Sequence, residues 1–172
     1  MAVVKKNELE QRITEYEMEL EQLRSQLTLV AEQEAAREQF MSSKQIIELV
    51  RQQTGRELNM STIKRWADEG YLGDVVDEKQ AFPALRTKQG KKRFLYPKEE
   101  VRQFLHEKGY LLPAFDVLDQ VWLGGERAMV MKAALQKGEF QYTVQLESTF
   151  DIQKGVMESQ LSKEGLEIES EN

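Results

Sequence analysis

The side chains best suited to chemistry in this sequence are basic ones that gather in its middle third. Residues 42–112 carry 14 Lys and Arg against 10 Asp and Glu, a net charge of +4. The flanking segments are acidic, with net charges of −4 for residues 1–41 and −6 for residues 113–172. Because physiological salt screens charges beyond ~8 Å, the local sign matters more than the total, and only the middle third can attract phosphate.

Residues that carry enzymatic or metal-binding chemistry are scarce. The chain has no cysteine, which excludes disulfides, thiolate nucleophiles and cysteine-based zinc sites. Its single histidine, His106, falls on the polar side of an expected helix, and we interpret it as a solvated surface residue. Gly124-Gly125 lacks the surrounding pattern of a nucleotide-binding loop. The sequence therefore predicts no enzymatic activity, no catalytic residue, no metal site and no cofactor.

The first 41 residues have the pattern of a coiled coil. Apolar residues recur at alternating spacings of four and three, and no Gly or Pro interrupts them. We expect a helix over about residues 6–34 that pairs with a second copy, and the flanking charges favour a parallel dimer, with a trimer or tetramer still open. A helix that packs on its own chain is the alternative. The predicted oligomerisation residues are Leu9, Ile13, Tyr16, Leu20, Leu23, Leu27 and Val30.

Residues 42–112 have the order of elements found in a winged helix-turn-helix. Two short helices are flanked by Ser and Asn caps on one side and by glycines on the other. A hairpin with a basic tip around Gly90 follows, and its returning strand alternates basic and aromatic residues. The expected elements are helices over 44–53, 62–69 and 97–109, a long loop over 73–85, and a hairpin over 86–96.

This middle segment resembles the MerR/excisionase-like winged helix-turn-helix superfamily. Residues 62–72 (TIKRWADEGYL) are similar to the recognition helix and its exit, and residues 93–97 (RFLYP) with Val101 are similar to the wing strand and the next helix. The resemblance implies double-stranded DNA as the partner. It places Thr62, Lys64 and Arg65 at the major groove or its flanking phosphates. It places five wing residues at the backbone or a minor groove: Arg86, Lys88, Lys91, Lys92 and Arg93.

The chain also departs from the MerR regulators. Its heptads precede the DNA-binding segment, whereas in those regulators the dimerising helix follows it, and it has no cysteine for metal sensing. The resemblance therefore implies the DNA-binding module and no sensor function. Trp66 is expected in the core, because it lies three residues from Ile63 on one helical face.

The C-terminal residues carry less information. Phe115, Leu118 and Trp122 suit one face of a short helix. Residues 126–137 favour a helix by composition but also alternate, whereas residues 139–147 alternate clearly and predict a strand. That strand needs a partner, either residues 128–135 in a hairpin or another chain. We expect a small region of unknown role over 113–163, able to bind another protein, and a disordered acidic tail over 164–172.

Together these patterns predict a mainly α protein with a small β wing and a C-terminal segment that is α+β or partly disordered. The predicted function is a homodimeric, sequence-specific DNA-binding protein of the cytoplasm, associated with the nucleoid and acting as a transcriptional regulator. Two alternatives stay open: an architectural DNA binder in excision, packaging or segregation, and a coiled-coil scaffold that binds protein. No run of 18 apolar residues exists, so a membrane is not an expected partner.

Overall fold

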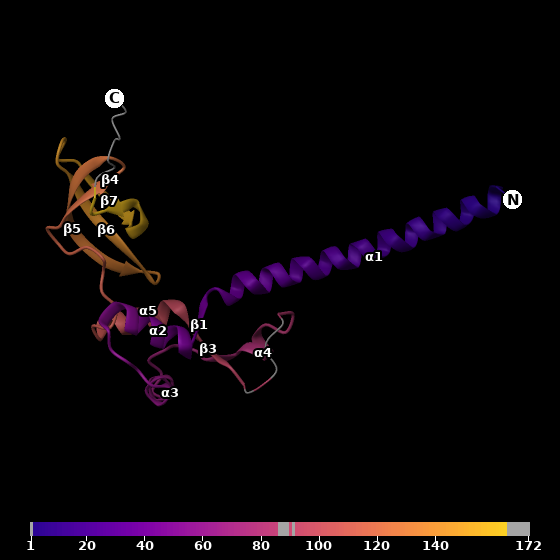
Figure 1. Ribbon diagram of the computed structural model, residues 1–172, viewed down its shortest axis with the longest axis horizontal. Coiled ribbons are helices and arrows are strands. Elements are labelled where there is room, and N and C mark those ends of the chain that lie inside the picture. The colour runs from indigo at the N-terminus through magenta and orange to yellow at the C-terminus, as the bar shows by residue number, and fades with distance from the viewer. Residues whose placement is uncertain (1, 86–89, 91, 165–172) are drawn as a thin grey trace, which may run out of the picture. The chain divides into compact units, whose positions relative to one another are not determined.

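The computed structural model describes residues 2–85, 90 and 92–164, with side chains from residue 5 onward. Helices account for 46% and strands for 26% of the structure, which makes it an α+β fold. The prediction of a mainly α protein is therefore wrong, because the C-terminal region forms a five-stranded sheet (Figure 1). The chain divides into two compact units, one of Met1–Phe40 with Val76–Leu95 and one of Met41–Val75 with Tyr96–Asn172.

The first unit begins with α1 (Ala2–Arg37), one continuous helix of 36 residues that extends beyond both predicted ends (Figure 1). At ~1.5 Å per residue, the helix is about 54 Å long. Its last turns contact a later segment of the same unit: Gln33 Oε1 accepts a hydrogen bond from the Ala84 N–H at 2.8 Å. Just beyond the helix, the Phe40 ring packs edge-on against Phe82 at 5.8 Å.

The expected long loop over residues 73–85 contains regular structure. It forms β2 (Val76–Asp77) and the one-turn helix α4 (Glu78–Ala81), which Asp77 caps by accepting from the Lys79 N–H at 3.0 Å. β2 pairs antiparallel with β3 (Phe94–Pro97), which is the predicted returning strand of the wing. β3 is the central strand of a three-stranded sheet whose third member is β1 (Phe40–Ser42).

The second unit contains the three predicted helices of the middle segment, α2 (Ser43–Thr54), α3 (Met60–Asp68) and α5 (Lys98–Glu107). Each lies within two residues of its predicted bounds, because local signals define the ends. Ser42 and Gln45 form a capping box before α2, and Gly55 ends it in the left-handed conformation. The helices share one apolar core made of Ile46, Val50, Ile63, Trp66, Leu72, Val101, Phe104 and Leu105.

The C-terminal part of the second unit is an antiparallel sheet with the strand order β7-β6-β5-β4-β8 (Figure 1). The last strand returns through a short 3₁₀ helix to pair with the first strand of the sheet. Inward side chains of β6 alternate with outward ones, as predicted for that strand. The elements are β4 (Gln120–Leu123), β5 (Glu126–Gln136), β6 (Glu139–Leu146), β7 (Ile152–Met157), η1 (Glu158–Gln160) and β8 (Leu161–Ser162).

Two helical expectations in this region are wrong. Residues 126–136 form β5 and pair with β6, so the hairpin alternative is confirmed and the helical propensity of the segment is overridden by strand pairing. Residues 115–122 form a turn followed by β4. Leu118 has a positive φ of 74° and is exposed, while Phe115 is buried edge-on against Tyr142 at 5.6 Å. The predicted tail over 164–172 lies outside the described residues, apart from residue 164.

α5 packs against one end of this sheet. Arg102 is half-buried and its Nε donates to the Gly138 carbonyl in the β5–β6 turn, and desolvation by burial lowers the pKa of its guanidinium. Gly138 has a φ of 78°, a left-handed conformation that other residues rarely adopt. A Cβ there would also lie 3.3 Å from the Glu99 Cα, so both backbone conformation and space favour glycine. The helices α2, α3 and α5 and the sheet therefore share one continuous apolar core.

Candidate nucleic-acid interface

The helix α3, predicted to be the recognition helix, has its apolar and polar residues on separate faces. Ile63 is fully buried and Trp66 is 8% exposed, whereas Lys64 and Arg65 point into solvent. Trp66 packs edge-on against Phe104 with ring centroids 5.1 Å apart, which confirms its predicted place in the core. This packing fixes the rotation of α3 and holds its basic face outward.

The first turn of α3 differs from the sequence expectation. The helix begins at Met60, two residues earlier than predicted, because Asn59 is its N-cap. Asn59 Oδ1 accepts from the Thr62 N–H and hydroxyl, both at 2.9 Å, and from the Ser61 hydroxyl at 2.6 Å. The Thr62 hydroxyl proton is therefore used in the cap, so this predicted DNA contact has only acceptor capacity left for a ligand.

The earlier start adds two exposed side chains that the site prediction omitted. Met60 is 54% exposed and Ser61 is exposed, and both precede Lys64 on the same face of the helix. N-terminal residues of a recognition helix are the ones that reach base edges in helix-turn-helix proteins. The N-cap preference of Asn59 was the sequence signal that could have found them.

Only part of the predicted wing lies within the described residues. Arg86, Lys88 and Lys91 lie outside the described residues, whereas Lys92 and Arg93 precede β3 and are exposed. The Arg93 Nε lies 3.7 Å from Glu78 Oε2, and the Glu78 N–H donates to the Arg93 carbonyl at 3.0 Å. The Arg93 side chain thus pairs with the Glu78 carboxylate, although it stays 52% exposed.

The Glu78 carboxylate pairs with two arginines of the first unit, Arg37 and Arg93. Its side chain is buried and also accepts from Arg37 Nε at 3.2 Å, at the C-terminal end of α1. The Glu78 carboxylate therefore contacts both the C-terminal end of α1 and Arg93, the residue before β3. The sequence predicted only a long loop around Glu78, because its partners Arg37 and Arg93 are distant in the chain.

His106 does not have the solvated role expected from the sequence. Its Nδ1 lies 3.0 Å from the Leu111 carbonyl oxygen, and its ring packs edge-on against Phe140 at 5.2 Å. The chain turns back after α5 at Gly109, whose φ is 80°, and this brings Leu111 under the helix end. His106 is therefore a structural residue between α5 and the sheet.

Among residues 2–85, 90 and 92–164, no group of three or more His, Asp or Glu side chains is placed to hold a metal ion. Within the same residues, no helix combines the length and the apolar character needed to cross a membrane.

Comparison of the chain with models of known protein families, with curated proteins and with solved structures gave no match.

Proposed function

We propose that this protein binds double-stranded DNA sequence-specifically as a homodimer and acts as a transcriptional regulator at the nucleoid, in the cytoplasm. One observation carries the proposal: α3 buries Ile63 and Trp66 and presents Lys64 and Arg65 to solvent. Lys and Arg are the side chains that most often read guanine in the major groove, which admits a helix of this size. The basic character of residues 42–112 supports the same partner.

The dimer in this proposal forms through α1. Six of the seven heptad residues are large, and their exposed fractions range from 46% at Leu20 to 69% at Leu27. The seventh, Val30, is half-buried. A regular apolar stripe of this kind on a charged helix is typical of a coiled coil, in which a second copy covers it. A dimer would present two copies of α3 to two half-sites on the DNA.

The test is fluorescence anisotropy of the full chain with a selected duplex and a scrambled one, at several salt concentrations. Replacing Lys64 or Arg65 by Ala should weaken binding to the selected duplex by ~1–3 kcal/mol if the side chain reads a base. The difference in affinity between the selected and the scrambled duplex should then become smaller. Lys137→Ala is the matched control, because it removes the same charge from an exposed position in the β5–β6 turn.

The outcomes separate the proposal from its rivals. Unchanged binding in both α3 variants would reject α3 as the reader. Binding that never distinguishes the two duplexes would favour an architectural role, and no binding by the unmodified chain at low salt would favour a protein-binding scaffold.

A further inference from the structure

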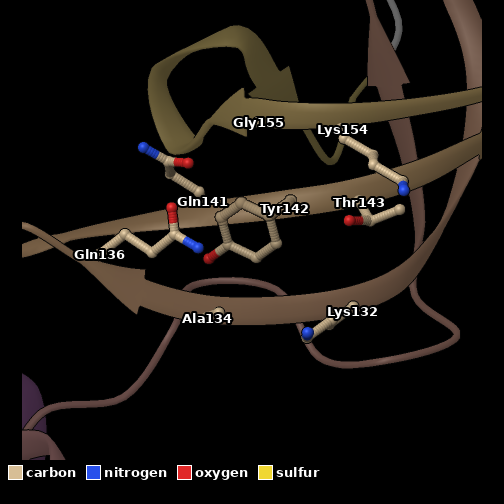
Figure 2. Close-up of a pocket in the computed structure, with 8 residues that line it drawn as sticks. All are labelled: Lys132, Ala134, Gln136, Gln141, Tyr142, Thr143, Lys154 and Gly155. Carbon is tan, nitrogen blue, oxygen red and sulfur yellow. The ribbon is translucent and has the colours of Figure 1, made fainter.

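The C-terminal sheet carries a second feature with the chemistry of a binding site. A hollow of about 580 Å³ opens over strands β5, β6 and β7 (Figure 2). Two lysines line it from the strands on either side of Thr143. Its lining residues are Lys132, Ala134, Gln136, Gln141, Tyr142, Thr143, Lys154 and Gly155.

Two irregularities in strand pairing bring these residues together. Lys132 lies directly opposite Thr143, just after the register shift between β5 and β6. On the other side, β6 has one residue between Tyr142 and Val144 where β7 has two, so Thr143 faces Lys154 and Gly155. Such bulges re-aim side chains and are frequent next to functional sites. Gly155 permits this one, because its φ is 67°.

The hollow is basic within an acidic region. Residues 113–172 have a net charge of −6, yet two lysines and no carboxylate line the hollow. Within the described residues, neither Lys132 nor Lys154 takes part in an ion pair. Both ammonium groups are therefore available to an anion from outside.

We infer that this hollow is a second DNA-contacting surface, which binds backbone phosphates independently of base sequence. The inference rests on the proposed DNA binding and extends it from α3 to the sheet. Its lining of Lys, Gln and Thr side chains matches side chains that donate to phosphate oxygens in protein–DNA complexes, whereas the Tyr142 hydroxyl already donates to Glu158.

The lining favours a phosphate backbone over an acidic peptide. Binding of a peptide depends on apolar or aromatic anchors that fill pockets. Here the apolar contributions are Ala134, which is small, and the ring of Tyr142, which is 1% exposed. The hollow therefore offers charge and hydrogen bonds, which suffice for phosphate.

The test uses the full chain carrying Lys132→Gln and Lys154→Gln together, in anisotropy titrations with a scrambled duplex over a range of salt. Both side chains are exposed or line the open hollow, so the fold is expected to persist, and far-UV circular dichroism checks this. The slope of log K against log salt should flatten by up to ~1.8 per protomer, ~0.9 for each lost phosphate contact. Lys137→Gln, in the β5–β6 turn outside the hollow, is the control and should leave the slope unchanged.

The binding data for this double variant are compared with those for Lys64→Ala. If Lys64→Ala lowers affinity for the selected duplex and the double variant keeps the original slope, this inference is overturned and the proposed function stands. If the double variant flattens the slope and the α3 variants bind normally, the sheet is a DNA surface and α3 is not the reader. An unmodified chain that binds polyglutamate but no duplex overturns both and assigns the hollow to an acidic protein.

Discussion

α1 and the C-terminal sheet differ in how far their apolar residues are buried. α1 is held by local hydrogen bonds and leaves its heptad stripe in solvent, with Leu23 54% exposed and Leu27 69% exposed. In the sheet, every second residue of β6 is buried under neighbouring strands and α5. The sheet is therefore stabilised by burial within one chain, whereas the apolar stripe of α1 is the surface that the proposed dimer would bury.

The largest effect is expected from charged substitutions in the apolar stripe of α1, which should prevent dimerisation. Leu20→Glu with Leu23→Glu would put four carboxylates into the seam of a dimer, where each lost leucine burial is worth ~1.5–3 kcal/mol. We expect sedimentation equilibrium to show a monomer for the variant and a dimer for the unmodified chain. Ser25→Glu is the control, since it adds charge at an exposed position outside the heptad stripe. A monomeric unmodified chain at high micromolar concentration would contradict the coiled coil.

The next largest effect is a loss of stability, expected from a substitution in the core of the sheet. Leu146, at the end of β6, is 6% exposed, and Leu146→Ala should lower the free energy of unfolding by ~2–5 kcal/mol. Because the contact is within one chain, the loss should not depend on protein concentration, in contrast to the α1 variant. Ser148→Ala, at an exposed position just beyond β6, is the control and should change stability by less than ~0.5 kcal/mol. Urea titrations at two protein concentrations measure both quantities.

The smallest effect concerns a hydrogen bond that links β6 to η1. The Tyr142 hydroxyl donates to Glu158 Oε2 at 2.6 Å, and Tyr142→Phe should cost ~0.5–1.5 kcal/mol at neutral pH. Burial and this hydrogen bond raise the pKa of the Tyr142 phenol well above its ordinary value. A raised folded-state pKa stabilises the fold below the ordinary phenol pKa of ~10, and this contribution is lost as pH rises further.

The pH profile sharpens that prediction. Unfolding by urea should become easier in the unmodified chain as pH rises from about 9 to about 11, and the phenylalanine variant should lack the part of this change that comes from Tyr142. Identical pH profiles for the two proteins would show that the phenol does not contribute to stability in this range.

Much of the helical half of the molecule could be predicted from the sequence. The heptads predicted α1, and capping residues such as Ser42 and Gly55 predicted the ends of α2 within a residue. The three-residue spacing of Ile63 and Trp66 predicted the core position of Trp66, which is 8% exposed. These features depend on neighbours no more than a few positions apart, which the sequence displays directly.

Only the tertiary structure decided the C-terminal sheet and the residues it brings together. Residues 126–137 combine helix-forming composition with weak alternation, and pairing of β5 with β6 and β4 determined the outcome. The bulges that place Lys132, Thr143 and Lys154 around one hollow are properties of strand register. Likewise, Glu78 meets Arg37 across 41 residues of sequence. Contacts of this kind depend on long-range pairing, which no local pattern of residue types specifies.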